Sequence, residues 1–431
     1  MSKAIISNMI YMNADPTLMS ALTKKLTYRI EVIRSKTGKF NSVETIRNYT
    51  IPKAGVIAIP QGRMDLVPAD YEIVDKRTQI EVDFPSPKIS LRPGQLLVLE
   101  EWEDSGILNA LVGWGKSYTA LWIAFKLGQK TLVVAHNTML RDQWIKDIKT
   151  LFGIEPGIIG SGEFNIDSPI VVGNVQTLTK HSQALADKFG TIILDEMHHC
   201  PASTFSTIMG SSKARYRIGL SGTMERKDKK HVLFKDFFGP IVHKPPQSNT
   251  MNPTVRIIKS GKKLLPGAAY AKKINELMED QDYQGFIAAI AKTQIARGHK
   301  VLVVADRVDF LVTVDRLIGD DSVVITGDTA DFEGREQAKL DVETGLKSCI
   351  CGSRQIFAEG ISINPLSCII LTCPISSEIL LEQLIGRVMR EFPGKKDPVV
   401  LDINFAGPAE KTQNNIRLAF YLMKGWEIQM V

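Results

Sequence analysis

The sequence predicts an α/β protein in which two similar domains, each built on a doubly wound parallel sheet, follow a small N-terminal α+β domain. Three observations support this prediction. An eight-residue segment recurs within the chain, strand-like and helix-like patterns alternate from residue 89 onward, and short runs broken by prolines fill the residues before it. With 431 residues, the chain is long enough for two or three domains with cores of their own.

The repeated segment is GQKTLVVA at 128–135, which returns as GHKVLVVA at 298–305. Each copy follows a helix-like apolar pattern, begins with a glycine that can stop a helix, and ends in a β-branched run typical of a buried parallel strand. Coincidence is the alternative, because a glycine and a lysine often precede a strand. Further strands are predicted at Thr191–Leu194, Arg217–Leu220, Cys368–Thr372 and Val399–Ile403. Helix-like patterns between them favour doubly wound sheets, whose ligands bind at the carboxyl ends of strands.

The first 88 residues have a different pattern. Short β-like runs at Lys53–Ile59, Tyr71–Val74 and Gln79–Phe84 are separated by prolines, and Pro85-Ser86-Pro87 resembles an exit from a small domain. The turn-rich segment Pro245–Pro253 predicts a second boundary. We therefore expect an accessory domain at 1–88 and two parallel-sheet domains at 89–250 and 251–431.

Composition excludes several classes of protein. Apolar residues make up 44% and charged residues 23% of the chain, as in an ordinary globular protein. No run of eighteen apolar residues predicts a membrane helix, and the N-terminus lacks a signal-peptide pattern, so we expect a cytoplasmic protein without membrane contact. The five cysteines do not form a disulfide framework, and Cys349 and Cys351 are expected to be buried strand thiols rather than metal ligands.

Positive charge is concentrated toward the N-terminus. The net charge of +6 is compatible with binding a phosphate backbone but is weak evidence alone. Residues 1–88 hold 13 basic and 9 acidic side chains, residues 89–253 hold 18 and 15, and residues 254–431 hold 22 and 23. The excess therefore lies in the first two thirds of the chain.

A glycine-rich segment, ALVGWGKS at 110–117, follows an apolar run and precedes a helix-like pattern. Gly113 and Gly115 allow backbone N–H groups to curl around phosphate oxygens at a helix N-terminus. Lys116 can then reach the β- and γ-phosphates of ATP, and the Ser117 hydroxyl can bind Mg²⁺. Ala110 replaces the first glycine of the usual pattern, and an ordinary glycine-containing turn is the alternative.

An acidic pair, Asp195-Glu196, ends the predicted strand Thr191–Leu194. A carboxylate at this end of a strand is where a P-loop fold needs its second Mg²⁺ group, so Asp195 is expected to hold the metal through water. Glu196 is expected to position and deprotonate the attacking water. A solvated acidic strand end is the alternative. His198-His199 and Cys200 do not make a convincing zinc site, because adjacent histidines diverge and a fourth ligand is not evident.

These motifs and the segments around them resemble those of superfamily 2 helicases, which have two RecA-like domains. RPGQ at 92–95 is similar to the adenine-reading segment, which implies a contact from Gln95. The segment from His136-Asn137-Thr138 through Gln143-Trp144 resembles motif Ia, although the family usually has Pro-Thr where His136-Asn137 stands, and SGT at 221–223 resembles motif III. The resemblance implies DNA contacts from Asn137, Thr138, Gln143, Gln176 and Thr177, and coupling of the ATP site to the strand by His198, Ser221 and Thr223.

The second half of the chain continues the same order of motifs. The segment from Ser353 to Ser362 resembles motif V, which implies a DNA contact from Ser353 and a nucleotide contact from Gly360. QLIGRVMR at 383–390 resembles motif VI, in which Gln383 couples the sites and Arg387 and Arg390 are catalytic. The two arginines are three residues apart, so on a helix they share a face from which both could reach one γ-phosphate. Two solvated surface arginines are the alternative.

The resemblance is greatest to branch-migrating recombination helicases of large lytic bacteriophages, with fork-remodelling and restriction helicases next. It implies an ATP- and Mg²⁺-dependent motor that moves 3′-to-5′ on single-stranded, forked and four-way DNA. It also implies action as a monomer, in the host cytoplasm if the gene is a phage gene. An RNA helicase and an ATP-dependent clamp that separates no strands remain open, because backbone-binding motifs do not reveal the sugar.

The basic accessory domain has the charge expected of a duplex-holding module. Candidate contacts are Arg47, Lys53, Arg63, Lys76 and Arg77, although each could be an ordinary solvated charge. Covering an apolar face of the next domain is the alternative role. Nuclease activity is not favoured, because Asp70, Glu72, Asp75 and Lys76 lack the spacing of a nuclease site and fit an exposed hairpin better.

Overall fold

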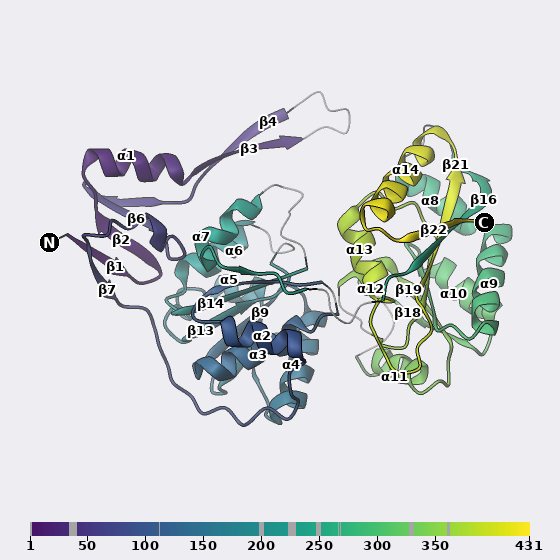
Figure 1. The fold of residues 1–431 in the computed structure, drawn as a ribbon, viewed down its shortest axis with the longest axis horizontal. Helices are drawn as coiled ribbons and strands as arrows, with labels where there is room; N and C mark the ends of the chain where they lie inside the picture. Colours follow the sequence, from purple (N-terminus) through teal and green to yellow (C-terminus); the bar gives the residue numbers. More distant parts are fainter. Residues whose placement is uncertain are drawn as a thin grey trace. The chain divides into compact units, whose positions relative to one another are not determined.

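A computed structural model describes residues 2–33, 41–111, 113–197, 202–222, 230–246, 251–265, 267, 269–326, 332–359 and 363–431. The chain forms two compact units, Met1–Gln247 and Ser248–Val431 (Figure 1). The described helices include none that is long and apolar enough to cross a membrane.

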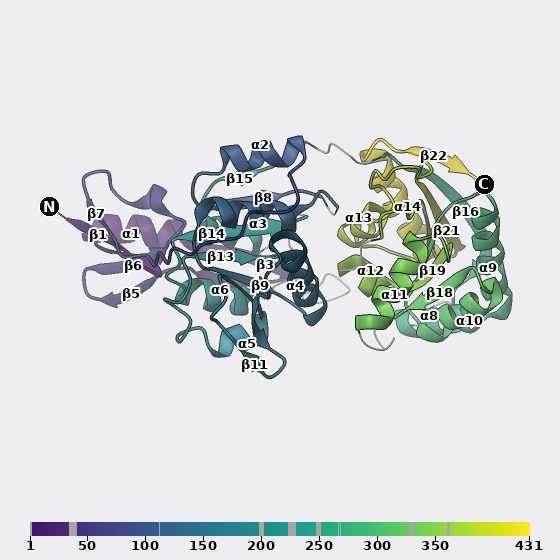
Figure 2. The ribbon, with the colours of Figure 1, turned by 90° about the horizontal axis from the view of Figure 1, so that it is seen from below.

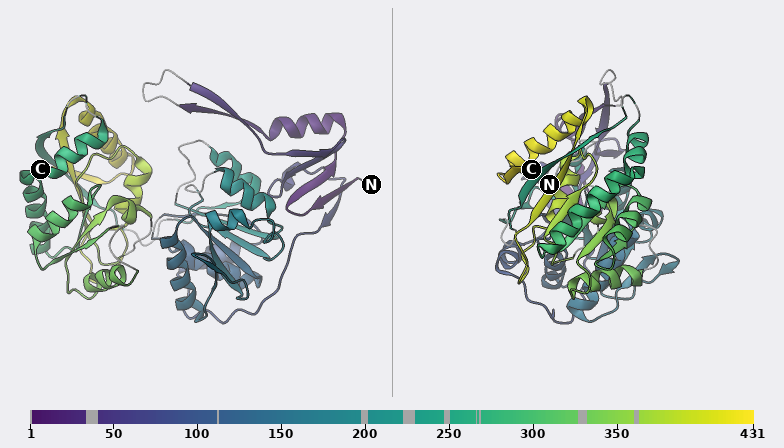
Figure 3. Two further views of the ribbon diagram at one scale, coloured as in Figure 1. Left: turned by 180° about the vertical axis from the view of Figure 1, so that it is seen from behind. Right: turned by 90° about the vertical axis from the view of Figure 1, so that its right-hand side faces the viewer.

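The first unit begins with an N-terminal module, which we define as residues 2–75. Its five-stranded sheet has the order β5-β6-β2-β1-β7 and is covered by α1, and a separate pair, β3 and β4, forms a long hairpin that projects from it (Figure 3). The bounds are β1 Lys3–Ile6, β2 Met9–Asn13, α1 Pro16–Lys25, β3 Thr27–Ile33, β4 Asn41–Arg47, β5 Thr50–Lys53, β6 Val56–Pro60, a 3₁₀ turn Met64–Leu66 and β7 Glu72–Asp75.

Two expected strands of this region are wrong in detail. Lys53–Ile59 is a hairpin rather than one strand, because Gly55 turns the chain with a φ of +73° between β5 and β6. Gln79–Phe84 is not a strand of the module. It runs instead along the following domain, where Ile80 accepts a hydrogen bond from the Lys130 N–H (2.7 Å) and Val82 donates one to Gly128 (3.0 Å). The expected strand Tyr71–Val74 is present as β7, but the hairpin expected around Asp70, Glu72 and Asp75 is not formed there, because β7 pairs in parallel with β1.

The rest of the first unit is a doubly wound domain. Its sheet has the order β11-β10-β12-β9-β13-β14-β8-β15, and only β11 is antiparallel to its neighbour. The strands are β8 Gly106–Asn109, β9 Thr131–Ala135, β10 Gly157–Gly160, β11 Glu163–Phe164, β12 Ile170–Asn174, β13 Thr191–Leu194, β14 Tyr216–Ser221 and β15 Val242–His243. The helices are α2 Pro93–Glu101, α3 Lys116–Leu127, α4 Thr138–Phe152, α5 Val175–Lys180, α6 Ala202–Ser211, a 3₁₀ turn Lys230–Leu233 and α7 Phe234–Phe238.

Both faces of this sheet are covered because its strands are apolar on both sides. One face packs against α2, α3 and α4 through a core that includes Trp102, Trp144 and Ile193, and the other packs against α5, α6 and α7 around Phe238 and Leu194. Continuous apolar strands of this kind are typical of a parallel sheet between two helix layers.

The second unit repeats this plan with a seven-stranded parallel sheet of order β18-β19-β17-β20-β21-β16-β22. Figure 2 shows α8, α9 and α10 on one side of the sheet and α13 and α14 on the other. The strands are β16 Thr254–Lys263, β17 Val301–Ala305, β18 Ser322–Ile325, β19 Cys349–Ser353, β20 Cys368–Leu371, β21 Val399–Ala406 and β22 Glu427–Met430. The helices are α8 Tyr270–Glu279, α9 Gln281–Ala296, α10 Val308–Ile318, α11 Phe332–Glu343, α12 Arg354–Glu359, α13 Glu378–Gly386 and α14 Pro408–Met423.

The internal repeat corresponds to real structural equivalence. Its two copies end in β9 and β17, which are central five-residue strands, each fully buried and each preceded by a helix. The four strands expected elsewhere are present as β13, β14, β20 and β21. The cysteine expectation is confirmed too, since Cys349 and Cys351 are free, buried thiols on β19.

Candidate active site

The glycine-rich segment forms a loop between β8 and α3. Gly113 and Gly115 have φ values of +90° and +95°, which only glycine adopts readily, and α3 begins directly afterwards at Lys116. The Lys116 side chain is 8% exposed, and its Nζ donates to the carbonyl of Ala110 (3.0 Å) at the other end of the loop. Ser117 follows in the first turn of the helix. The loop therefore presents an ammonium group and a hydroxyl at a helix N-terminus.

The acidic pair lies at the same edge of the sheet, after β13. Lys116 Nζ is 3.6 Å from Glu196 Oε1, so a lysine from one strand-end faces a carboxylate from the next strand but one. Glu196 has a φ of +42°, and its N–H donates to Asp195 Oδ1 (2.9 Å). Asp195 is 5% exposed, and burial together with the charge of Glu196 raises the pKa of Asp195 to about 6. Two carboxylates held this close are stabilised by a cation between them.

Sequence reasoning missed Trp144 as a partner of this pair. Its indole Nε1 donates to Asp195 Oδ2 (2.8 Å) from α4, and the side chain is 1% exposed. A buried indole must place its N–H on an acceptor, and a tryptophan next to Gln143 was a usable signal. Trp144 thus fixes the orientation of Asp195 and ties it to the helix that begins at the candidate strand-binding residues.

Gln95 and Arg92 brace the loop from α2. Gln95 Nε2 donates to the carbonyls of Trp114 (3.2 Å) and Gly115 (3.3 Å), and Arg92 Nη2 also donates to Trp114. A Cβ at Gly115 would lie 2.3 Å from Gln95 Nε2, so the close approach requires glycine. Arg92 is a second residue that sequence reasoning missed. Gln95 was expected to contact the adenine. In this structure its side-chain amide holds the glycine-rich loop, which is the loop expected to bind the phosphates.

Ser221 lies between the two halves of the site. It ends β14, the strand that separates β8 from β13, and its carbonyl accepts from the Ala110 N–H (3.1 Å). The neighbouring Leu220 carbonyl accepts from the N–H of Met197, directly after the acidic pair (3.1 Å). The strand of the expected coupling motif is therefore hydrogen-bonded both to the glycine-rich loop and to the residue that follows the acidic pair. His198 and Thr223 lie outside the described residues.

The expected strand contacts gather at the ends of β9 and β12. Asn137 caps α4 by accepting from the Leu140 N–H (2.8 Å), and Thr138 is the first residue of that helix. Gln143 donates to Asp147 (2.8 Å). Gln176 and Thr177 lie in the first turn of α5, with Gln176 exposed and donating to the His136 carbonyl (3.4 Å). All five residues lie near the carboxyl edge of one sheet. The side-chain oxygen of Asn137 has a structural role there, because it caps α4.

The described residues expected in the second unit lie at its own carboxyl edge, on α13 or just beyond that helix. Ser353 ends β19, and Gln383 is buried on α13. Arg387 is buried and its Nε donates to the carbonyl of Phe357 (2.7 Å), whereas Arg390 Nη1 donates to Asn364 (3.4 Å). Gly360 lies outside the described residues.

The expectation that Arg387 and Arg390 share a helical face is wrong. Helix α13 ends at Gly386, Arg387 is its C-cap, and the chain leaves through a tight turn in which Arg387 and Val388 donate to Leu384 and Ile385. Lys395 then holds this turn, because its Nζ donates to the carbonyls of Val388 (2.7 Å) and Arg390 (2.6 Å). The arginines are therefore oriented by a braced loop and not by helical periodicity.

The donor set suits Mg²⁺ with a phosphate. The Ser117 hydroxyl and the oxygens of Asp195 and Glu196 are the hard ligands that Mg²⁺ prefers, and Lys116 supplies a fixed positive charge at the loop. Within the described ranges there is no cluster of histidine, cysteine and carboxylate that would suit another metal. A lysine on a glycine loop facing an aspartate–glutamate pair, in a chain with a second sheet of the same plan, defines a two-domain P-loop motor ATPase.

Comparison with known proteins identifies the family within this class. Residues 88–226 match the family model described as "Type III restriction enzyme, res subunit". The chain is 41% identical over 444 residues to "Probable helicase D10" of Escherichia phage T5, covering 99% of this chain and 95% of the relative. It is 26% identical over 338 residues to "ATP-dependent DNA helicase uvsW" of Enterobacteria phage T4, covering 72% and 67%. The chain therefore belongs to the superfamily 2 helicases, in the family of the phage T5 helicase.

A solved structure supports the fold. S. cerevisiae Dbp5 bound to RNA and ADP BeF3 superposes with a TM-score of 0.58 at 14% sequence identity, covering 80% of this chain and 90% of that chain. At this identity the likeness concerns the RecA-like fold alone. The predicted fold class and helicase family are confirmed, and the protein is an ATP-dependent helicase that binds nucleic acid.

Proposed function

We propose that this helicase is a DNA translocase that remodels forked and four-way DNA, moving 3′-to-5′ as a monomer in recombination, replication or repair. The observation that carries the motor assignment is the 3.6 Å approach of Lys116 to Glu196 across the carboxyl edge of the first sheet. The DNA assignment is supported by the resemblance of the motifs and by the printed name of the phage T4 relative.

The ATP site would work through five side chains of the first unit. Lys116 binds the β- and γ-phosphates, and Ser117 and Asp195 hold Mg²⁺, which neutralises phosphate charge when bound. Glu196 takes the proton of the attacking water, and its carboxylate is oriented for this because its own backbone is fixed to Asp195. The Gln95 brace on the loop keeps Gly115 in its conformation, and Gln95 reads the adenine from the same position.

Arg387 and Arg390 would stabilise the charge that develops on the transferred phosphoryl group, a contribution worth roughly 10³–10⁵ in rate. Ser353, Asn137, Thr138, Gln176 and Thr177 would bind the strand backbone, with Gln143 supporting its helix. Contacts to phosphates carry no base information, so this motor should respond to the structure of the DNA more than to its sequence.

The N-terminal module would hold a duplex arm, through fewer residues than its sequence suggests. The charge of Arg63 is neutralised because it pairs with both Asp65 (2.8 Å) and Asp236 (3.0 Å), whereas Arg77 shares the Asp75 carboxylate (2.7 Å) with Arg215 (2.8 Å). Arg47, Lys53 and Lys76 are exposed, and the structure shows no ion pair for them within its described part. Arg47 and Lys53 are therefore the exposed candidates on the module, and Lys76 directly follows it.

The deciding experiment measures ATP turnover and strand displacement side by side. Turnover is compared on single-stranded, duplex, forked and four-way DNA and on matched RNA, and displacement on partial duplexes with either a 3′ or a 5′ single-stranded tail. We expect the highest turnover on DNA forks or junctions, and displacement only with the 3′ tail. Equal or greater stimulation by RNA would replace the DNA assignment with an RNA helicase, and turnover without displacement or branch migration would leave a clamp.

A further inference from the structure

The amino-terminal edge of the second sheet carries a cluster of cations that the functions above do not use. We call it the basic edge and define it as Arg256, Arg297, His299, Lys300 and Lys396. Arg297, His299 and Lys300 directly precede β17, Lys396 precedes β21, and Arg256 lies on β16. Arg297 and Lys396 are exposed and the other three half-buried.

The internal repeat allows this edge to be compared with its counterpart in the first unit. There, the equivalent residues Gly128-Gln129-Lys130 are covered by the segment that follows the N-terminal module. Lys130 N donates to Ile80 O (2.7 Å), Val82 N to Gly128 O (3.0 Å), and Ile80 N to Gln129 Oε1 (2.6 Å). One copy of the repeat is thus paired with an extended peptide.

A single side chain explains why the second copy is not paired in this way. Gly190 N and Ser367 N occupy equivalent places, donating to Lys130 O and Lys300 O at 2.9 Å each. A Cβ at Gly190 would lie 3.1 Å from Ile80 N and 2.6 Å from Gln129 Oε1, so the covering peptide requires glycine there. Ser367 stands in this position in the second unit, and its Oγ accepts from Lys300 N (3.1 Å). At the basic edge the Lys300 N–H is therefore already bonded within the second unit and needs no added peptide strand.

Charge is the second distinguishing feature of this edge. Within the described residues none of the five side chains forms an ion pair, although residues 254–431 as a whole carry one more acidic than basic side chain. Lys396 packs over Gly298, whose added Cβ would lie 3.4 Å from its Nζ. Burial and then the neighbouring cations Lys396, Arg256 and Arg297 lower the pKa of His299, against an opposing effect of Asp397. The cations of this edge outnumber the carboxylates Asp397 and Asp321, whose charges act on His299 and Lys300, and such an excess of positive charge favours an anionic ligand.

We propose that the basic edge is a second nucleic-acid site, which binds the phosphodiester backbone of a part of the substrate that the motor does not grip. This inference rests on the proposed function. The five-residue strand β17 puts this edge roughly 16 Å from the carboxyl edge that holds Ser353. A phosphate backbone is favoured over an acidic peptide strand, because the N–H group that pairs with a peptide in the first unit is here already bonded to Ser367.

The side chains of the edge have different parts in this site. Arg297 and Lys396 are exposed and supply direct phosphate contacts. Lys300 Nζ is held by the Lys347 carbonyl (2.7 Å) and Ser348 Oγ (3.1 Å), and Arg256 Nε by Gln429 (3.1 Å), so these two add positive potential more than new hydrogen bonds. The test should therefore change Arg297 and Lys396.

The experiment reverses both charges in the full-length chain, as Arg297→Glu with Lys396→Glu. The matched control, Lys292→Glu with Lys339→Glu, makes the same change in net charge on α9 and α11. Binding to single-stranded, duplex and forked DNA is measured by fluorescence anisotropy over a series of salt concentrations, beside ATP turnover on saturating single strands and a thermal melt. We expect the edge variant to bind forks about tenfold more weakly or worse, with a salt slope smaller by about 2, since two phosphate contacts are lost.

The substrates identify which part of the DNA is bound. If the edge variant binds duplex and forked DNA more weakly but single strands normally, the edge contacts a duplex arm. If its affinity for single strands falls as well, the edge contacts a displaced strand. The control and the single-strand-stimulated turnover should remain unchanged. Fork affinity and salt slope equal to those of the control would overturn the proposal, including the case in which the edge binds an acidic protein. Failure of the proposed function would give a different result: in the unmodified protein, no nucleic acid would stimulate ATP turnover.

Discussion

Asp236 offers a stringent test of how the N-terminal module is joined to the motor domain. This carboxylate lies on α7, is fully buried, and accepts hydrogen bonds from three residues of the module region: Tyr28 (2.9 Å), Asn48 (2.6 Å) and Arg63 (3.0 Å). Burial raises the pKa of Asp236, and the three donors oppose the rise. The perturbation is Asp236→Ala, which removes the acceptor and leaves the donors in place.

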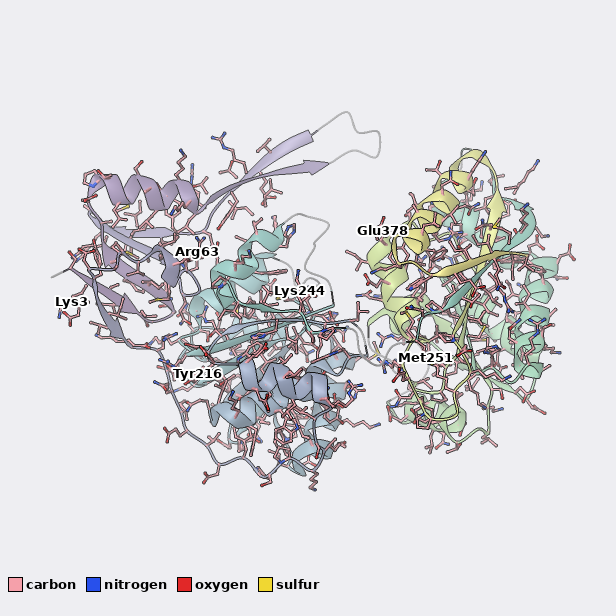
Figure 4. All side chains as sticks on the ribbon, in the orientation of Figure 1. Lys3, Arg63, Tyr216, Lys244, Met251 and Glu378 are labelled. Carbon is pink, nitrogen blue, oxygen red and sulfur yellow. The ribbon has the colours of Figure 1, made fainter. Side chains whose placement is uncertain are left out.

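The expected cost follows from what each donor loses. A hydrogen bond to a charged group contributes about 1.5–3 kcal/mol, and removing one partner of a buried ion pair costs about 3–5 kcal/mol when the other is left uncompensated. The Arg63 charge is not left uncompensated in this variant, because Asp65 still accepts two hydrogen bonds from it, at 2.8 and 3.0 Å (Figure 4 labels Arg63). Tyr28 and Asn48 are half-buried and can recover water in part. We therefore expect a loss of about 3 kcal/mol.

Asp65→Ala is the matched control, since it removes the other partner of Arg63. The Asp65 side chain is 50% exposed, so this change should cost only about 0.2–1 kcal/mol. Urea unfolding of the full-length variants, followed by fluorescence and circular dichroism, gives the free energies of unfolding of the first unit. If Asp236→Ala were no more destabilising than Asp65→Ala, the polar junction would not hold the module to the motor.

Three further predictions concern the chemistry. Glu196→Gln should keep nucleotide binding and lose turnover, whereas Lys116→Ala should lose both in equilibrium binding and phosphate-release assays; undiminished hydrolysis in either would remove the central assignment. Arg390→Ala should lower kcat severely with less effect on nucleotide affinity, as a transition-state contact requires, and equal losses in both would refute that role. Trp144→Phe removes the hydrogen bond to Asp195 and should weaken Mg²⁺-dependent binding of a fluorescent ADP roughly tenfold, with metal-free binding as the control; unchanged Mg²⁺ dependence would contradict the positioning role.

The fold was largely predictable because its signal is local. A buried parallel strand must be apolar along its whole length, so β9, β13, β17 and β20 could be located from sequence within about a residue. The ATP site could be found for a related reason: phosphate loops need glycine at positions of positive φ and a lysine at the helix start, and both requirements appear in consecutive residues.

Long-range pairing was not predictable, and the wrong expectations share this cause. The run Gln79–Phe84 alternates as a strand should, but its partners are Gly128 and Lys130, far along the chain, and nothing in its own pattern names them. The turn that carries Arg387 and Arg390 depends on Lys395 donating back to Val388 and Arg390. Trp144 was visible as a tryptophan, but its acceptor lies 51 residues away.

The segment Gln61-Gly62-Arg63 includes Arg63, a candidate duplex contact, but in the structure it serves to attach the N-terminal module. In the structure Gly62 and Arg63 contact the motor domain, whereas Gln61 bonds within the module. Gln61 donates to Ser7 (2.6 Å), and an added Cβ at Gly62 would lie 2.5 Å from the backbone of Gly239. Arg63 is spent on Asp65 and Asp236. Deleting the module would therefore expose a buried carboxylate and apolar surface of the motor, so its DNA role is better tested by reversing exposed charges in the intact chain.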